Sequence, residues 1–147
     1  MRAVVQRVAR AAVRCGEQER AIGPGLGVLV AVVAGDTEED LIYTADKIAH
    51  LRIFDNEAGR MDRSVLDLGG EVLVVSQFTL AANLARGRRP DFTGAARPEV
   101  AAPMVEALVA RLRLAGLAVV EGFFGANMAV ALVNDGPVTL WLDSRRR

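Results

Sequence analysis

The chain has 147 residues and a mass of 15.7 kDa, a size that accommodates one domain with a hydrophobic core. Its 52% hydrophobic and 24% charged residues exclude an intrinsically disordered or collagen-like chain. Eighteen basic residues balance eighteen acidic ones, so the net charge gives no general attraction to nucleic acid or membranes. With Cys15 and His50 each the single residue of its type, the chain lacks an internal disulfide and the ligand set of a Cys/His zinc site.

Two strands are predicted at the start of the chain. Residues 3–15 mix valine and alanine with arginine in rough alternation, which indicates a strand. The polar residues 16–20 predict a hairpin connection. Residues 26–33 form a continuous run of mainly Val and Leu, which is typical of a strand buried on both faces. The longest apolar stretch, 26–34, is too short to span a bilayer.

A helix is predicted after the second strand. Either Thr37 with Asp40 or Asp36 with Glu39 fits a capping box at its N-terminus. Its apolar stripe comprises Ile42, Ala45, Ile48 and Ala49.

The rest of the chain is predicted to contain further strands around one more helix. Residues 51–54 and 71–80 indicate strands. Residues 81–97 have no hydrophobic periodicity and predict a long loop, which in a compact domain is usually functional or disordered. Pro98 opens a second helix, and Gly116 ends it as a C-cap. Strand-like runs close the chain at residues 117–124, 128–133 and 138–142.

Together these elements predict an α/β fold: a single compact domain with a mixed, barrel-like β-sheet and two main helices. The domain covers residues 1–144, and residues 145–147 form a basic C-terminal tail. The N-terminus lacks the uninterrupted apolar core of a signal peptide. We therefore expect a cytoplasmic protein that does not associate with membranes.

Several catalytic motifs are absent from the sequence. No Gly-Lys pair is present for a phosphate-binding P-loop, and no G-x-G-x-x-G motif follows a strand. Ser64, Ser76 and Ser144 lack the flanking glycines of a G-x-S-x-G nucleophile elbow. Nucleotide hydrolysis and α/β-hydrolase chemistry therefore have little support.

Polar side chains at a strand end form the first candidate site. Ser76, Gln77 and Thr79 lie just before the long loop, a common position for active sites. The alternative is a strand that turns polar as it leaves the core.

His50 with Asp46, one helical turn earlier, could form a base and its orienting carboxylate. The alternative for this pair is a surface contact at a helix end, favoured by the helix dipole.

Two loops complete the set of candidates. Residues 134–139 separate two strand-like runs and contain the usual turn residues, which predicts a hairpin turn. Arg86, Arg88 and Arg89 make the long loop basic. Such a cluster can contact phosphates or can remain solvated surface charge.

Several motifs in order resemble those of the D-aminoacyl-tRNA deacylase family, from the first residues to Ser144. They are MRAVVQRV, IGPGL, GDTEED, KIAHLRIF, GGEVLVVSQFTL, GRRPDF and FGANMAVALVNDGPVTLWLDS. SQFTL and NDGPVT together are highly specific. Residues 81–85 depart from the more polar stretch that is usual in the family, and the first hairpin is shorter. These departures concern the contacts with the substrate.

The resemblance implies a homodimeric hydrolase that cleaves the ester joining a D-amino acid, or glycine, to the 3′ adenosine of tRNA. It implies a cis Gly136–Pro137 bond that enters the partner subunit's active site, where its carbonyls leave no room for an L side chain. The pocket is expected to be lined by Ser76, Gln77, Phe78 and Thr79. Contacts to tRNA or substrate are expected from Arg86, Arg88, Arg89 and Met128.

Two accounts of catalysis fit these residues, and neither uses a metal or cofactor. In one, Thr79 acts as nucleophile, but a threonine hydroxyl needs an adjacent base for this role. In the other, the terminal ribose 2′-hydroxyl assists, while backbone N–H groups and Gln77 or Ser76 stabilise the developing oxyanion. Because no base is evident, the residues favour the second account.

Two other function classes remain open. A small-molecule esterase or peptidase would use Thr79 on esters or peptides without tRNA. A non-catalytic RNA-binding module would use the arginine clusters. An aromatic content of 5% predicts that the chain lacks the stacking platform usual in proteins that bind single strands.

Overall fold

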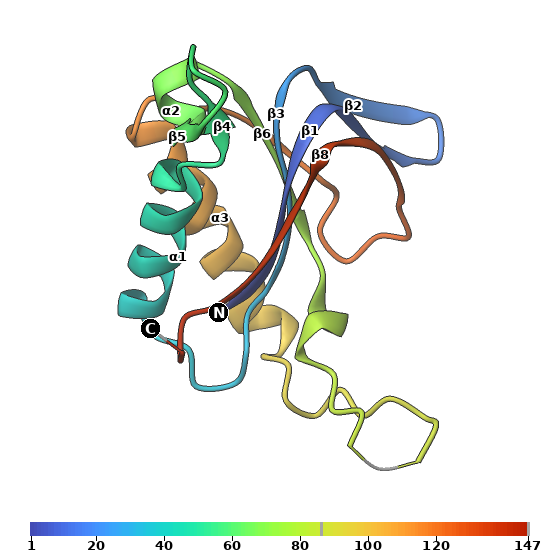
Figure 1. Cartoon of the computed structure of the whole chain (residues 1–147). Helices are drawn as coiled ribbons and strands as arrows, with labels where there is room; N and C mark the ends of the chain where they lie inside the picture. The colour runs from blue at the N-terminus through green and yellow to red at the C-terminus, as the bar shows by residue number, and fades with distance from the viewer. Residues whose placement is uncertain (86, 147) are drawn as a thin grey trace.

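The computed structural model of the chain describes residues 1–85 and 87–146. A mixed sheet runs in the order β2-β1-β3-β6-β7, with β8 also paired to β1. The helices cover one face of this sheet (Figure 1). The mixed α/β expectation is therefore confirmed. The strands are β1 (Arg2–Cys15), β2 (Gln18–Ile22), β3 (Gly25–Ala31), β6 (Glu71–Ser76), β7 (Ala118–Glu121) and β8 (Ala129–Asp143).

The strand directions place three carboxyl ends at one edge. β1 is antiparallel to β2, β3 and β8, whereas β6 is parallel to both β3 and β7. Parallel neighbours need crossover connections, usually a helix. Helices α1 (Glu38–His50) and α3 (Pro98–Leu114) lie in the two crossovers and pack on the same face. The segments that follow β3, β6 and β7 consequently start from the same edge of the sheet.

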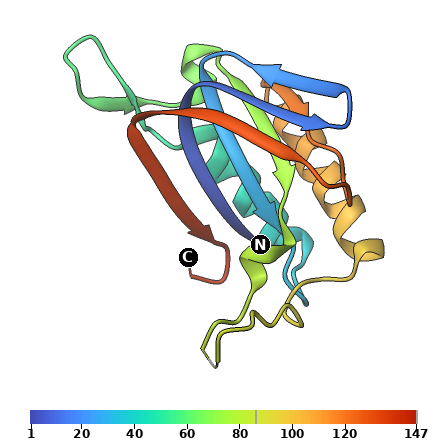
Figure 2. The same cartoon turned by 90° about the vertical axis from the view of Figure 1, so that its right-hand side faces the viewer.

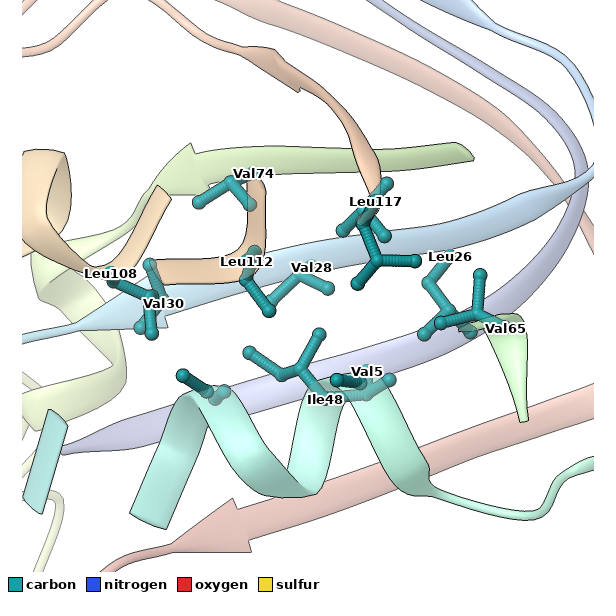
Figure 3. Close-up of a cluster of buried hydrophobic side chains, with 14 of the residues drawn as sticks. Val5, Leu26, Val28, Val30, Ile48, Val65, Val74, Leu108, Leu112 and Leu117 are labelled. Carbon is teal, nitrogen blue, oxygen red and sulfur yellow. The ribbon is translucent and has the colours of Figure 1, made fainter. Parts of the chain in front are cut away.

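The main core lies between the sheet and these two helices. Figure 3 shows valines of the strands, such as Val28 and Val74, meeting Ile48 of α1 and Leu108 and Leu112 of α3. These side chains are almost completely buried, and each contributes about 1.5–3 kcal/mol by leaving water. A smaller cluster, in which Leu132 of β8 packs with Val8 and Leu73, includes residues of β1, β3, β6 and β8. The sheet therefore curls into a nearly closed, barrel-like form (Figure 2).

The start of α1 confirms one of the two predicted caps. Thr37 is the N-cap, and it forms a capping box with Asp40. The hydrogen bond from the Thr37 backbone N–H holds the pKa of Asp40 well below its usual range. Next to this cap, buried Asp36 pairs with the Met1 ammonium group at 2.9 Å and with Arg145 at 3.1 Å. Arg145 of the predicted basic tail is thus bound to the body of the domain, whereas Arg147 lies outside the described residues.

Several predicted boundaries are wrong, for local reasons. A third helix, α2 (Val65–Leu68), begins at a capping box of Ser64 and Asp67. It was not predicted, because a helix this short shows no hydrophobic periodicity. Residues 51–53 form no strand, and only β4 (Phe54–Asp55) pairs with β5 (Met61–Arg63). β6 ends at Ser76, and residues 78–81 form the 3-10 helix η1 (Phe78–Ala81).

The end of the chain also differs from the prediction. β7 stops at Glu121, and the two expected final strands are one strand, β8, with an irregularity in the middle. No helix in the described ranges is long and apolar enough to cross a membrane.

Candidate active site

A cavity of about 570 Å³ lies at the edge where the parallel strands end. Its wall is formed by residues that follow β3, β6 and β7, together with the start of α3. Ligands of α/β sheets usually bind outside the carboxyl ends of the strands. The volume is also within the range of about 300–1,000 Å³ that is typical of small-molecule sites. This cavity is therefore the candidate active site.

The predicted strand-end residues divide between two places. Ser76, Gln77 and Phe78 line the cavity, and so does Met128 from the opposite wall. Thr79 instead lines a neighbouring hollow with Arg2 and Trp141. The Gln77 side-chain amide donates a hydrogen bond to the Thr79 hydroxyl at 2.5 Å. The Thr79 oxygen is thus held by an amide donor.

The turn into η1 brings two backbone amides to this edge, that of Phe78 at the cavity and that of Thr79 at the neighbouring hollow. Gln77 N–H bonds to the Val30 carbonyl, which fixes the end of β6 on β3. Within the described ranges, the amides of Phe78 and Thr79 donate to no backbone carbonyl, because they precede the first repeat of η1. Such amides can stabilise a developing oxyanion.

The loop of residues 122–128, of which residues 124–128 line the cavity, is held by Arg20 of β2. Arg20 Nη1 donates to the carbonyls of Glu121 at 2.8 Å and Gly122 at 3.1 Å. Its guanidinium lies over the ring of Phe123, 4.1 Å from the centroid. We did not expect this contact, because no spacing in the sequence links the first hairpin to a loop about a hundred residues later.

Aromatic side chains gather at the cavity, which corrects the expectation of no stacking platform. Phe78, Phe92 and Phe124 all line it, and all three are exposed. The rings of Phe78 and Phe92 meet edge to face with centroids 5.2 Å apart. The low aromatic content was misleading because three of the five phenylalanines converge from separate segments.

The basic loop projects from the cavity edge. Figures 1 and 2 show residues 82–85 and 87–94 extending away from the sheet beyond η1. Arg88 and Arg89 are exposed on this loop, and Asn83 and Asp91 pair across its base. Arg86 lies outside the described residues.

The Gly136–Pro137 segment is not the predicted hairpin turn. It is a bulge within β8, because Thr139 pairs with Gln6 and Asn134 with Val8, which leaves the residues between them unpaired. The Gly136–Pro137 peptide bond is cis, as the resemblance implies. Both residues are exposed, and neither lines the cavity of its own chain.

Buried Arg7 holds this bulge from beneath. Its Nε donates to the Asp135 carbonyl at 3.3 Å, and its Nη1 donates to the Ile53 carbonyl at 2.7 Å. A Cβ at Gly136 would lie 2.6 Å from Arg7 Nη2. The guanidinium thus ties the bulge to the segment after α1. Residue 7 looked like any other arginine of the first strand in the sequence.

His50 lies on an exposed helix end. Its Nδ1 is 3.0 Å from the Asp46 carbonyl and 3.3 Å from the Asp46 carboxylate, and both side chains are exposed. His50 borders a shallow depression between α1 and α3, with residues that do not line the cavity. The structure therefore favours the surface interpretation of this pair.

Comparison with known proteins agrees with this geometry. Residues 4–143 match the family model of D-Tyr-tRNA(Tyr) deacylase. A D-aminoacyl-tRNA deacylase of Heliobacterium modesticaldum is 58% identical over 146 residues, covering 99% of this chain and 97% of that protein. A protein of the same name from Thermus aquaticus is 53% identical over 148 residues, covering 100% of this chain and 97% of the relative.

Solved structures share the fold. One described as c-Myc DNA unwinding element binding protein has a TM-score of 0.91 and 41% identity, covering 97% of this chain and 98% of its own. A probable eukaryotic D-amino acid tRNA deacylase has a TM-score of 0.84 at 18% identity, covering 96% and 97%. The family model and the relatives match nearly the whole length, and the cavity has the polar strand end that the motif predicts. The chain therefore belongs to the D-Tyr-tRNA(Tyr) deacylase family.

Proposed function

We propose that this protein hydrolyses the ester bond of D-aminoacyl-tRNA and releases the D-amino acid and free tRNA. The observation that carries the proposal is the cavity at the ends of the parallel strands, lined by Ser76, Gln77 and Phe78 in a chain of this family. Glycyl-tRNA is a second substrate, because glycine has no side chain that a chiral pocket could reject. This activity serves quality control in translation.

The proposed chemistry relies on positioning. Water adds to the ester carbonyl carbon, the bond to the ribose oxygen breaks, and a proton passes to that oxygen. The amides of Phe78 and Thr79 stabilise the oxyanion that forms. We assign the assisting role to the terminal ribose 2′-hydroxyl. Thr79 is bonded by the Gln77 amide, which cannot act as its base, and His50 lies on an exposed helix end away from the cavity.

The proposed active site needs two copies of the chain. The Gly136–Pro137 bulge projects from β8 and is exposed in a single chain. We place the bulge of one subunit in the cavity of its partner, where main-chain carbonyls meet the amino-acid end. A wall made of main chain accepts many D side chains and excludes the opposite hand sterically.

The deciding experiment compares matched D- and L-aminoacyl-tRNA with the purified protein. We expect fast release of the D-amino acid, slow release of the L-amino acid, and equal rates with and without a chelator. Esters without tRNA test the alternative of a general esterase. Tight tRNA binding without release of either amino acid would instead indicate an RNA-binding module and contradict the proposal.

A further inference from the structure

A second hollow adjoins the cavity, and we call it the outer hollow. It has a volume of about 520 Å³. It shares Phe92, Ala95 and Ala96 with the cavity, and Thr93, Arg97 and Val100 line it beyond this shared wall. The two spaces therefore adjoin each other along one short segment, residues 92–96.

The backbone of the shared wall is fixed to the sheet. The Ala96 amide donates to the Val32 carbonyl at 3.0 Å, and the Ala34 amide donates to the Gly94 carbonyl at 2.9 Å. The Phe92 ring rests edge to face on Phe78 and is still 37% exposed. A supported ring with an exposed surface is suited to stacking on a nucleobase.

The outer hollow also has a cation without an acidic partner. Arg97 forms no ion pair with any residue of the ranges 1–85 and 87–146. Arg145 borders the opposite side, where it donates to the Ala34 carbonyl at 2.6 Å and pairs with buried Asp36. Because Arg145 is already paired and Arg97 is not, Arg97 is the group of this hollow suited to a phosphate. The exposed acids Asp91 and Glu99 are its neighbours in the chain.

We propose that the outer hollow binds the nucleotide that precedes the terminal adenosine of tRNA. This inference rests on the proposed function: if the aminoacyl ester lies in the cavity, the unpaired RNA strand must leave it across a neighbouring surface. The base of that nucleotide stacks on Phe92, and its phosphate lies near Arg97. The tRNA therefore contributes affinity beyond its terminal adenosine.

The test compares two substrates of different length. One is D-tyrosyl-tRNA, and the other is the D-tyrosyl ester of adenosine, which has no preceding nucleotide. The variants are Arg97→Gln and Val100→Glu, both at exposed positions outside the cavity wall. Arg60→Gln, on the distant β4–β5 hairpin, controls for the loss of one positive charge.

We expect Arg97→Gln and Val100→Glu to lower kcat/KM for the tRNA substrate about tenfold, and to change it less than about twofold for the adenosine ester. The Arg60→Gln control should leave both values near wild type. Equal losses on both substrates, or no loss on tRNA, would overturn the inference.

A binding measurement separates this inference from the proposed function. A labelled oligoribonucleotide with the unpaired 3′-end sequence of tRNA needs no hydrolysis to report on the outer hollow. If the wild type cleaves neither substrate but binds the oligonucleotide, and Arg97→Gln weakens binding about tenfold, the deacylase proposal fails and the inference stands. If the oligonucleotide binds equally to both proteins, or to neither, the inference fails.

Discussion

Thr79 occupies a position where its hydroxyl accepts a hydrogen bond, and Asp143, the carboxylate that lines the same hollow, is paired with Arg2. The Gln77 amide donates to it, and the threonine lies in the hollow next to the cavity. A neutral amide cannot accept the proton that a nucleophilic hydroxyl must lose. The geometry therefore assigns Thr79 a role in orienting Gln77 and the backbone of η1.

We predict that Thr79→Ala lowers kcat for D-aminoacyl-tRNA less than about tenfold, because the variant loses one neutral hydrogen bond but does not lose a nucleophile. Single-turnover kinetics with D-tyrosyl-tRNA measure this rate. Thr79→Ser, which keeps the hydroxyl that Gln77 contacts, is the matched control. An acyl-enzyme trapped on Thr79, or activity at background in a folded variant, would restore the covalent mechanism.

Gly136 is restricted both by its backbone and by its neighbour. Its φ of +112° is unfavourable for any L side chain, and an added Cβ would meet the Arg7 guanidinium at 2.6 Å. The Arg7 side chain has little freedom to move, because it is buried and bonded to two carbonyls. A methyl group here must displace the bulge.

We predict that Gly136→Ala lowers kcat/KM about 100-fold, because a displaced wall misplaces the reacting ester. The melting temperature should change little, since the bulge is exposed. Gly59→Ala also tests a glycine at positive φ, but on the distant hairpin, and should leave the activity unchanged. Wild-type kinetics for Gly136→Ala would remove the bulge from the proposed site.

At the scale of elements, the loop of residues 122–128 depends on a hairpin from the other end of the chain. Arg20 binds the last carbonyl of β7, the next carbonyl and the Phe123 ring. Arg113 of α3 binds the same strand from another side, at Val119 and Glu121. Arg20 alone of these two contacts the start of the loop.

We predict that Arg20→Ala raises KM for D-aminoacyl-tRNA about tenfold with a smaller change in kcat, since two charge-assisted hydrogen bonds that position the wall are lost. Arg113→Ala, with similar contacts to β7, should change stability but not KM. Arg20→Lys should recover part of the affinity, because it keeps the cation over Phe123. Equal effects of Arg20→Ala and Arg113→Ala on KM would contradict a positioning role.

The elements show which parts of the fold follow from local sequence. The strands over residues 3–15 and 26–33 and the helix capped by Thr37 were predictable, because periodicity and capping are local. The end of β6 at Ser76 was not predictable, since residues 77–80 continue the alternation of polar and apolar side chains although the backbone turns into η1. For the site, the motif indicated Ser76, Gln77 and Phe78, whereas Arg7 and Arg20 act through tertiary contacts that no spacing shows.

At the scale of the whole molecule, β8 carries apolar side chains that a single chain leaves exposed. Val130 is 40%, Val133 is 43% and Trp141 is 53% exposed, on the same strand as the bulge. Exposed apolar groups that gather on one element are typical of an interaction surface. They support the proposed dimer, in which the bulge reaches a second copy.

We predict that the protein sediments as a dimer and that Val133→Glu shifts it toward the monomer with loss of deacylase activity. A charge at the centre of a subunit interface must be desolvated without a partner, whereas in a single chain it stays in water. Leu114→Glu on α3, where the leucine is 88% exposed, should leave both the dimer and the activity unchanged. A fully active monomer would contradict the two-copy site.

Most of the cavity wall lies outside the helix-covered core, and this has a consequence for how the molecule can diverge. The side chains that hold the fold together point between the sheet and α1 and α3, whereas the substrate walls are segments that follow the strand ends. Mutations at the exposed positions of those segments should alter ligand contacts with little cost in folding free energy. Selection can therefore change which ligand the cavity accepts without redesigning the scaffold.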